Sequence, residues 1–325
     1  MNISINDLLK PIHAEMITFE RVFEESLKSH VFLINQVMKY MVAHKGKKMR
    51  PMLLVLAAKL GGECTDQTYT SASLIEVLHT ATLIHDDVVD EAETRRGLPS
   101  INSIWRNKIS ILIGDYLFSK ALINMVNLEN PEALKLLSHT ANRLVTGEID
   151  QIDRAKSDTM TEEAYYNMID DKTASLVASA CQLGIMSTSD DPKAWAALNA
   201  FGKNFGIAFQ IKDDLFDFEG RAATVGKPVG LDVKHNMVTL PLIYTFNQMN
   251  KKEAQKLKRS WRKMDDKKAQ KEVLDTIKSS GGLDYTKQML ENFSQKAVES
   301  LNMFEDSSVK DSLTQFVAFN IQRQK

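Results

Sequence analysis

The stretch LIEVLHTATLIHDDVVD at residues 74–90 joins a long apolar run to three aspartates. Leu, Ile, Val and Ala cover most of the circumference of the helix that this stretch would form. A helix that is apolar nearly all round belongs in the interior of a large helical bundle. The sequence therefore predicts a buried helix over residues 71–92 with an acidic end.

A second stretch, FGIAFQIKDDLFD at residues 205–217, repeats this arrangement. Both stretches end in the pattern D-D-x-x-D, formed by Asp86, Asp87 and Asp90 and by Asp213, Asp214 and Asp217. The other Asp-Asp pairs, at 170–171, 190–191 and 265–266, lack the third aspartate. The full pattern is therefore confined to two apolar helices and is not a general abundance of acidic clusters.

Aspartates at positions i, i+1 and i+4 point to one face of a helix, within an arc of about 100°. Like charges one turn apart destabilise a helix by about 0.2–0.5 kcal/mol, and burial increases that cost. Six carboxylates facing a cavity therefore predict bound divalent cations. Oxygen ligands without Cys or clustered His favour Mg²⁺, which keeps waters and binds substrate phosphates. Two solvated helix caps are the alternative, and the apolar flanks disfavour it.

Three further residues share the faces of the two motifs. His79 lies two turns before Asp86 and within about 20° of the same face, and Gly206 stands in the same relation to Asp213. Gln210 lies one turn before Asp213. We expect a polar His, a space-making Gly and an amide to line the cavity that the aspartates line.

Basic residues flank both motifs, as a site for Mg²⁺ and diphosphate requires. Lys47 and Arg50 are three residues apart at a predicted helix start, where backbone N–H groups also favour anions. The other candidates are Arg95 and Arg96 after the first motif, Lys172 beside Thr173 within a predicted helix, and Lys227 in a predicted loop after the second motif. Each alone is typical of a surface charge, but together they predict diphosphate binding.

On these motifs the chain resembles the trans-polyprenyl diphosphate synthases, in particular the long-chain octaprenyl and heptaprenyl diphosphate synthases. The matching segments are KGKKMRP, LIEVLHTATLIHDDVVDEAETRRG, the Lys-Thr pair at 172–173, GIAFQIKDDLFD and GKPVGLDVKHNMVTLPLIY, in family order over residues 45–245. The resemblance implies an all-α, isoprenoid-synthase-like bundle of long helices around a central cavity. It also implies a dimer, as is usual in the family.

The same resemblance implies a role for each matching residue. Three Mg²⁺ ions would be held against an allylic diphosphate by Asp86, Asp87, Asp90, Asp213 and Asp214, with Asp217 on the same acidic face. The allylic site would contain Arg95, Lys172, Thr173, Gln210 and Lys227. The isopentenyl diphosphate site would contain Lys47, Arg50, His79 and Arg96. Relatives commonly carry Lys two residues before Thr-Leu-Pro, where this chain has Met237, and Lys234 is a candidate to compensate.

The expected reaction is head-to-tail condensation of isopentenyl diphosphate onto an allylic diphosphate such as farnesyl or geranyl diphosphate. In the family, aromatic residues four or five positions before the first motif shorten the product, and here those positions are Thr82 and Ala81. We therefore expect a long product, of hexaprenyl to decaprenyl size, for quinone side chains. Phe118 and Leu122 are candidates for the tunnel floor, with core packing as the alternative for each.

Other functions fit the sequence less well. A geranylgeranyl- or farnesyl-type short-chain synthase, a terpene cyclase and a head-to-head synthase share the ionisation chemistry. A terpene cyclase usually departs from the second D-D-x-x-D and needs no second basic site. A catalytic or silent subunit of a heteromeric synthase stays open because of Met237, and a helical scaffold is disfavoured by the intact acidic and basic sets.

Composition supports one domain over residues 1–325. With 41 basic and 42 acidic residues, the overall charge gives no reason to expect nucleic acid or an anionic membrane surface as a partner. The two cysteines make no disulfide framework, and we expect a cytoplasmic protein without a signal peptide or membrane span. Peripheral membrane contact during product release is a further expectation. Helices are predicted over 31–41, 51–60, 71–92, 109–128, 132–152, 162–186 and 192–218, with a charged peripheral segment after residue 250 and no strands.

Overall fold

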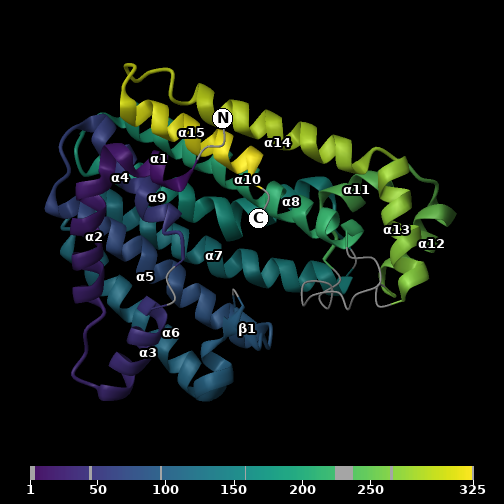
Figure 1. Ribbon diagram of the computed structural model, residues 1–325, viewed down its shortest axis with the longest axis horizontal. Coiled ribbons are helices and arrows are strands. Elements are labelled where there is room, and N and C mark those ends of the chain that lie inside the picture. The colour runs from purple at the N-terminus through teal and green to yellow at the C-terminus, as the bar shows by residue number, and fades with distance from the viewer. Residues whose placement is uncertain are drawn as a thin grey trace.

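The computed structural model describes residues 4–43, 46–95, 97–157, 159–223, 237–263 and 266–323, without the side chains of residues 156, 217 and 219–223. Long helices run side by side through the body of the molecule, and shorter ones close its ends (Figure 1). The first half contains α1 (Ile5–Leu9), η1 (Lys10–Ile12), α2 (His13–Ser26), α3 (Phe32–Ala43), α4 (Met49–Gly61), α5 (Asp66–Val89), β1 (Thr94–Arg95), β2 (Leu98–Pro99), α6 (Ile101–Asn127) and α7 (Pro131–Ser157). The second half contains α8 (Glu162–Ile169), η2 (Asp170–Ala174), α9 (Ser175–Met186), α10 (Pro192–Ala223), α11 (Leu240–Asn247), α12 (Lys251–Trp261), α13 (Lys267–Ser279), α14 (Gly282–Glu299) and α15 (Ser308–Gln322).

The predicted all-α bundle is confirmed, with two local differences. The expected helix over 162–186 is divided, because a π-helical turn, η2, separates α8 from α9. A small antiparallel hairpin, β1 with β2, stands where no strand was expected. Gly97 turns this hairpin with φ at 79°, a left-handed conformation that glycine adopts without strain.

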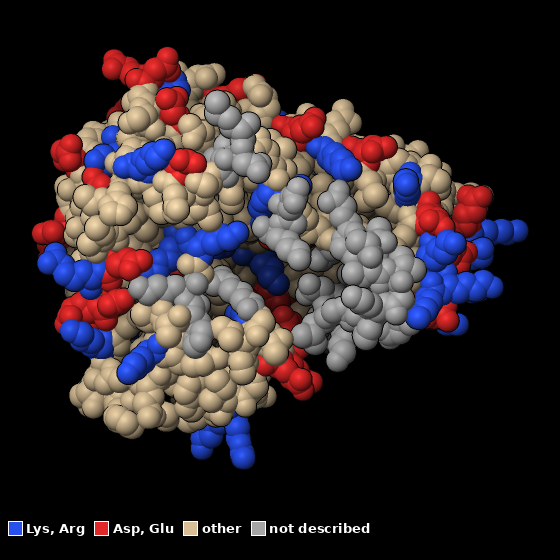
Figure 2. Space-filling model, viewed as in Figure 1, with Lys and Arg blue, Asp and Glu red and all other residues tan. Residues whose placement is uncertain are grey.

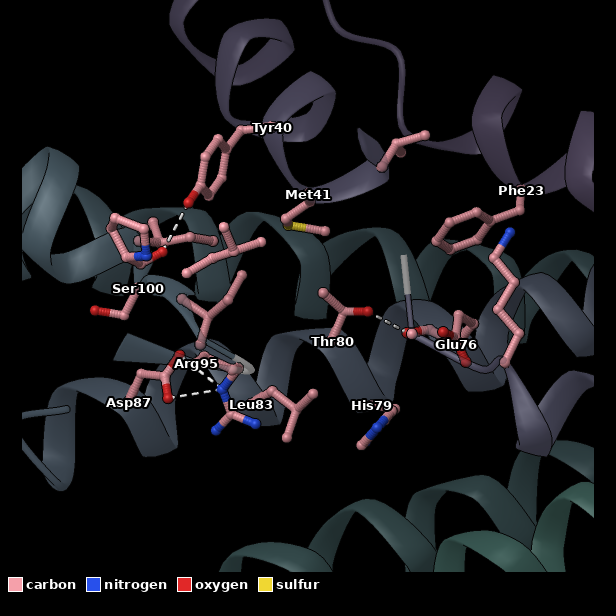
Figure 3. A pocket seen from close by; sticks show the side chains of 17 residues that line it. Phe23, Tyr40, Met41, Glu76, His79, Thr80, Leu83, Asp87, Arg95 and Ser100 are labelled. Atoms are coloured by element: carbon pink, nitrogen blue, oxygen red, sulfur yellow. Dashed lines mark hydrogen bonds and ion pairs between the residues drawn. The ribbon is translucent and has the colours of Figure 1, made fainter. Parts of the chain in front are cut away.

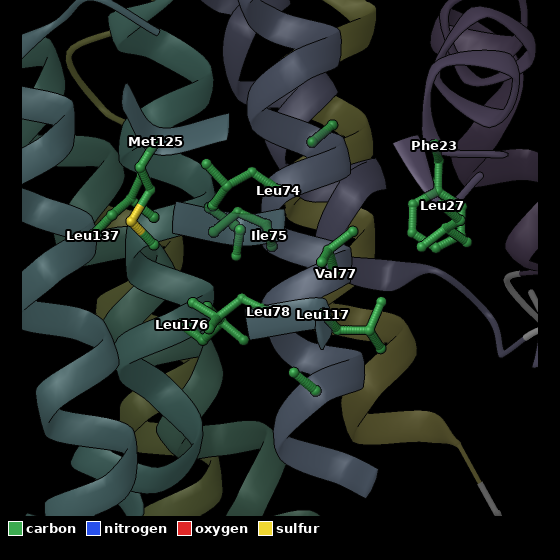
Figure 4. Close-up of a cluster of buried hydrophobic side chains, with 14 of the residues drawn as sticks. Phe23, Leu27, Leu74, Ile75, Val77, Leu78, Leu117, Met125, Leu137 and Leu176 are labelled. Carbon is green, nitrogen blue, oxygen red and sulfur yellow. The ribbon is translucent and has the colours of Figure 1, made fainter. Parts of the chain in front are cut away.

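The apolar run of α5 lies at the centre of the core. Leu74 and Leu78 are fully buried, and in Figure 4 they lie among side chains from neighbouring helices, including Leu137 of α7 and Leu176 of α9. Burial of each such leucine stabilises the fold by about 1.5–3 kcal/mol. The buried face therefore fixes α5 firmly and sets the position of its acidic end.

Two glycines allow neighbouring helices to approach η2 closely. A Cβ at Gly206 of α10 would lie 2.6 Å from the Ala174 Cα, and one at Gly147 of α7 would lie 3.0 Å from the Lys172 backbone nitrogen. The first distance is shorter than Cβ contacts allow and the second is unusually tight, so a side chain at either position would force its neighbours to shift. The expectation that Gly206 opens space in the cavity is therefore wrong, because its bare Cα packs against the π-helical turn.

The charged segment after residue 250 forms α12 and α13, which lie together at one end of the molecule in Figure 1. Leu257 and Trp261 anchor α12 in a small apolar cluster, while most of its Lys and Arg side chains are exposed. Within the described residues, α6 alone has the length and apolar composition of a membrane span. Its Leu117 and Ala121 are buried in the main core, so one side of this helix serves the bundle.

Candidate active site

The first acidic motif lies at the end of α5, next to the hairpin. Asp87 is only 6% exposed, and both of its carboxylate oxygens accept hydrogen bonds from the Arg95 Nε, at 2.8 and 2.9 Å. Figure 3 shows this pair beside a pocket of about 140 Å³ that lies between α2, α3, α5 and the hairpin. Asp86 and Asp90 lie at the same end of α5 and are partly exposed. Asp90 is the C-cap of this helix.

The second acidic motif lies on α10 and makes two kinds of contact. The carboxylate of Asp213 forms an ion pair with Arg323, which follows α15, at 2.6 Å. The carboxylate of Asp214 is 6% exposed and accepts hydrogen bonds from the Tyr165 hydroxyl at 2.7 Å and from the Gln210 Nε2 at 2.9 Å. The side chain of Asp217 lies outside the described residues.

The π-helical turn η2 connects the surroundings of the two motifs. The Lys172 ammonium donates to the Gln151 Oε1 at 3.1 Å and pairs with the Glu148 carboxylate at 2.6 Å, and both partners belong to α7. The Thr173 hydroxyl donates to the Gln210 Oε1 at 2.9 Å. Consecutive residues of one turn therefore contact opposite sides of the site.

Three of the predicted isopentenyl diphosphate residues line a second cavity of about 480 Å³, which shares His79 with the first pocket. The His79 Nε2 lies 2.9 Å from the Arg50 Nη1, and Lys47 lines the same cavity. Lys48, with φ at 50°, also lines this cavity, and its ammonium lies over the rings of Phe19 and Phe23. The cavity wall also contains Phe209, Phe319 and Arg323.

Burial makes the ionised acids of the site unfavourable in the absence of a cation. Burial raises the pKa of Asp86 to about 6; the Glu148 carboxylate adds to the rise and Lys172 opposes it. Burial also raises the pKa of Asp213, although Arg323 opposes the change. A carboxylate that is destabilised by desolvation gains from a bound cation.

The donor set fits Mg²⁺ only together with a substrate phosphate. No group of three or more Asp, Glu, His or Cys side chains within the described residues converges closely enough to hold a metal ion alone. Mg²⁺ typically uses one or two carboxylates and completes its shell with water and phosphate oxygens. Figure 2 shows a hollow near the centre of this face with basic side chains along one edge and acidic side chains on the other, as metal-bound diphosphate requires.

Several predicted residues remain to be placed. Arg96, Lys227 and Lys234 lie outside the described residues. Met237 lines a small pocket beside α12 that also contains Gln151, Arg154, Lys258 and Arg262, so basic side chains other than Lys234 surround it.

The predicted chain-length residues lie in different environments. Ala81 is fully buried in the core, whereas Thr82 is partly buried and its hydroxyl donates to the His79 carbonyl oxygen at 2.9 Å. Phe118 packs against the same core from α6. Leu122 is 49% exposed on the outer side of α6, so it does not form a tunnel floor within this chain.

The structure adds four residues that the motifs did not predict: Glu148, Gln151, Tyr165 and Arg323. Glu148 and Gln151 are three residues apart on a predicted helix, which was the available sign that they share a face. Tyr165 and Arg323 reach the site only through tertiary packing, and nothing in their local sequence marks them.

Comparison with known proteins agrees with this geometry. The family model described as Polyprenyl synthetase matches residues 31–277. The octaprenyl diphosphate synthase of Escherichia coli (strain K12) is 34% identical over 301 residues, which cover 93% of this chain and 93% of that protein. A crystal structure of a polyprenyl synthase from Caulobacter crescentus CB15, complexed with calcium and isoprenyl diphosphate, matches with a TM-score of 0.89 at 31% identity, over 100% of this chain and 99% of that one.

A second solved structure, a decaprenyl diphosphate synthase from Rhodobacter capsulatus, matches with a TM-score of 0.91 at 29% identity, over 99% of this chain and 100% of that one. The family model spans most of the chain, and both solved structures share its fold from end to end. The chain therefore belongs to the polyprenyl synthetase family of prenyltransferases.

Proposed function

We propose that this chain is a long-chain trans-polyprenyl diphosphate synthase that adds isopentenyl diphosphate units head to tail onto an allylic diphosphate. The observation that carries the proposal is the position of η2. Lys172 lies on the side of the first acidic motif, and Thr173 is linked through Gln210 to the second. The basic cavity with Arg50 and His79 then provides a place for a second diphosphate.

The chemistry begins with rupture of the allylic C–O bond, which leaves a carbocation and diphosphate. Bound Mg²⁺ supplies Lewis-acid stabilisation of the departing charge. Arg95 and Lys172 add fixed positive charge on the same side of the site. Lys47 and Arg50 hold isopentenyl diphosphate so that its alkene can attack, and the proton then lost goes to the released diphosphate. Phe209 and Phe319 in the cavity wall help to exclude water from the cation.

The metal ligands that we propose are the six aspartates of the two motifs, holding three Mg²⁺ ions between the protein and the allylic diphosphate. The desolvated carboxylates of Asp86 and Asp213 support this assignment, because each gains from a cation. Arg96 and Lys227 belong to the proposed diphosphate sites on the family pattern alone. Farnesyl or geranyl diphosphate is the proposed primer, and a quinone side chain is the proposed end use.

We also propose a homodimer formed through α6 and α7. Their outer sides carry large apolar side chains that are 36–66% exposed: Ile104, Ile111, Leu112, Leu122, Ile123, Val126, Leu134, Val145, Ile149 and Ile152. Exposed apolar side chains in such numbers are typical of a protein interface. A second copy of this chain is the occupant we favour, and a different subunit of a heteromeric synthase is the alternative outcome.

A peripheral contact with an anionic membrane is proposed for product release from a cytoplasmic enzyme. Residues 251–271 contain ten Lys or Arg and three Asp or Glu, whereas the whole chain has a net charge of −1. We call the exposed side chains Lys252, Arg259, Arg262, Lys263, Lys267 and Lys268 the basic surface. Each Lys or Arg near an anionic bilayer contributes about 1 kcal/mol. The basic surface lies at the end of the molecule where α12 and α13 meet (Figure 2).

The proposed function is tested by incubating the purified protein with Mg²⁺, farnesyl diphosphate and labelled isopentenyl diphosphate. We expect labelled products of hexaprenyl to decaprenyl size, and no product with EDTA. Products no longer than geranylgeranyl diphosphate would support the short-chain alternative. If this chain gives no product by itself but gives product once a second subunit is added, the heteromeric alternative would be supported.

A further inference from the structure

The strongest unassigned contact of the site is the hydrogen bond between Tyr165 of α8 and Asp214. The ring of Tyr165 is fully buried among Met168, Ile169 and Ile211, and its hydroxyl lies 2.7 Å from the Asp214 Oδ2. A phenylalanine would fill the same apolar space. The hydroxyl is therefore not needed for packing, and what it adds is one donor aimed at a buried carboxylate.

The contact continues across the site through a chain of hydrogen bonds. Asp214 also accepts from the Gln210 Nε2 at 2.9 Å, and the Gln210 Oε1 accepts from the Thr173 hydroxyl at 2.9 Å. The amide of Gln210 thus has a carboxylate on its nitrogen side and a hydroxyl donor on its oxygen side, so only one orientation satisfies both. The carboxylate of Asp214 must itself be fixed for this orientation to hold.

We propose that Tyr165 is a positioning residue for the allylic-diphosphate side of the site, acting through Asp214 on Gln210 and Thr173. The inference rests on the proposed function. Hydrogen bonds to a carboxylate are strong because they are charge-assisted, and this one comes from a rigid ring locked in the core.

The network lies on one side of the site only. Its members come from α8, η2 and α10, whereas Lys47 precedes α4, Arg50 belongs to α4 and His79 belongs to α5. Loss of the Tyr165 hydroxyl should therefore disturb the allylic substrate and leave isopentenyl diphosphate nearly unaffected. A purely structural role would affect both substrates alike or neither.

The test is Tyr165→Phe, with Tyr285→Phe as the matched control. Tyr285 also donates its hydroxyl to a carboxylate, that of Glu162, but it lies outside the network. We expect Tyr165→Phe to raise the KM for farnesyl diphosphate about 10-fold. This is the lower end of the effect typical of residues that hold a ligand-binding side chain in place. The KM for isopentenyl diphosphate should stay within about twofold, and the control should change neither.

Binding without turnover provides a second measurement. Calorimetric titration with farnesyl diphosphate and Mg²⁺, without isopentenyl diphosphate, should show the same loss of affinity in Tyr165→Phe. Thermal unfolding of Tyr165→Phe checks that the variant is folded, which we expect because phenylalanine fills the same apolar space. An active wild-type enzyme whose Tyr165→Phe variant shifts both KM values equally, or neither, overturns the positioning role. An inactive wild-type enzyme instead overturns the proposed function.

Discussion

Lys172 and Thr173 are neighbours in the chain, yet their side chains contact opposite sides of the site. The Lys172 ammonium lies at the α7 carboxylate of Glu148, whose charge acts on Asp86, while the Thr173 hydroxyl reaches Gln210 beside the second motif. A regular α-helix places consecutive side chains about 100° apart. The π-helical turn sets these two side chains between α7 and α10, and the site is assembled around them.

Lys172 provides the first prediction. Lys172→Met removes a cation from the leaving-group side, and loss of one such group typically lowers kcat by about 100-fold. Lys203→Met is the control, because Lys203 pairs with Asp170 of the same turn at 2.8 Å but is 49% exposed. Steady-state kinetics with saturating substrates measure the effect. A kcat within threefold of wild type for Lys172→Met would remove Lys172 from the catalytic set.

The ionised carboxylate of Asp86 should lower the free energy of unfolding and yet be essential for activity. Its pKa in the folded protein is about 6, above the ordinary value of 3.8, so folding favours the protonated form. The resulting loss of stability is absent below about pH 4, grows as the pH rises and is complete above about pH 6. Asp86→Asn should therefore raise the free energy of unfolding at pH 8 by up to about 2 kcal/mol in metal-free buffer, and should abolish activity.

Denaturant titrations at pH 8 and pH 5 check this sign. The increase in the free energy of unfolding caused by Asp86→Asn should be larger at pH 8 than at pH 5. A variant that is less stable than wild type at pH 8 would show that the Asp86 carboxylate already has a stabilising partner.

Product length is tested at Ala81. This residue is fully buried, so Ala81→Phe overpacks the core at a cost of about 1–3 kcal/mol and should shorten the product. Thr82→Phe, at a partly buried position, should shorten it with a smaller loss of stability. Ile17→Phe on the exposed side of α2 is the control. Chromatography of the dephosphorylated products measures length, and unchanged length in both variants would refute the tunnel assignment.

The proposed dimer predicts a change of mass after one substitution. Val126 is 66% exposed on α6, and Val126→Arg would bury a charge in an apolar interface. We expect sedimentation analysis to give a dimer for wild type and a monomer for the variant. Phe32→Arg is the control, because Phe32 is 75% exposed and belongs to α3, which is not part of the proposed interface. A wild-type monomer at micromolar concentration would contradict the proposal.

Membrane contact is tested by charge reversal on the basic surface. A triple variant with Lys252→Glu, Arg259→Glu and Lys268→Glu should lose co-sedimentation with phosphatidylglycerol vesicles while keeping its solution activity. The control reverses three exposed cations elsewhere: Arg21, Lys39 and Lys193. Equal binding of both variants, or equal binding of wild type to phosphatidylcholine vesicles, would show that the basic surface serves solubility alone.

Much of the fold followed from apolar patterning, because α5 and α10 are buried nearly all round and their sequences show it. The division of the predicted helix at 162–186 did not follow, because the polar run at 170–173 contains no Gly or Pro and is compatible with a continuous α-helix. The π-helical turn depends on the close approach of α7 and α10 at Gly147 and Gly206, which is a tertiary effect. The role of Arg323 could not be predicted either, because it lies 110 residues from its partner Asp213 in the sequence.

The pairing of Arg50 with His79 illustrates what could be predicted at the site. Each residue was identified from its position on a helix face or at a helix start, and the structure brings them within 2.9 Å. Tyr165 could not be identified in this way, because two adjacent tyrosines in a mostly apolar run look like any core segment. Its role depends on a hydroxyl that faces one carboxylate on another helix.

The turn at Asp170–Ala174 has a consequence for the length of the chain itself. A π-helical turn holds one residue more than the α-helix around it, so deleting a single residue there would let Glu162–Met186 close into one uninterrupted α-helix. The repaired helix would be more regular, but it would lose the wide turn that sets the Lys172 and Thr173 side chains between α7 and α10. Natural variants of this enzyme should therefore tolerate substitutions in this segment far better than they tolerate any change in its number of residues.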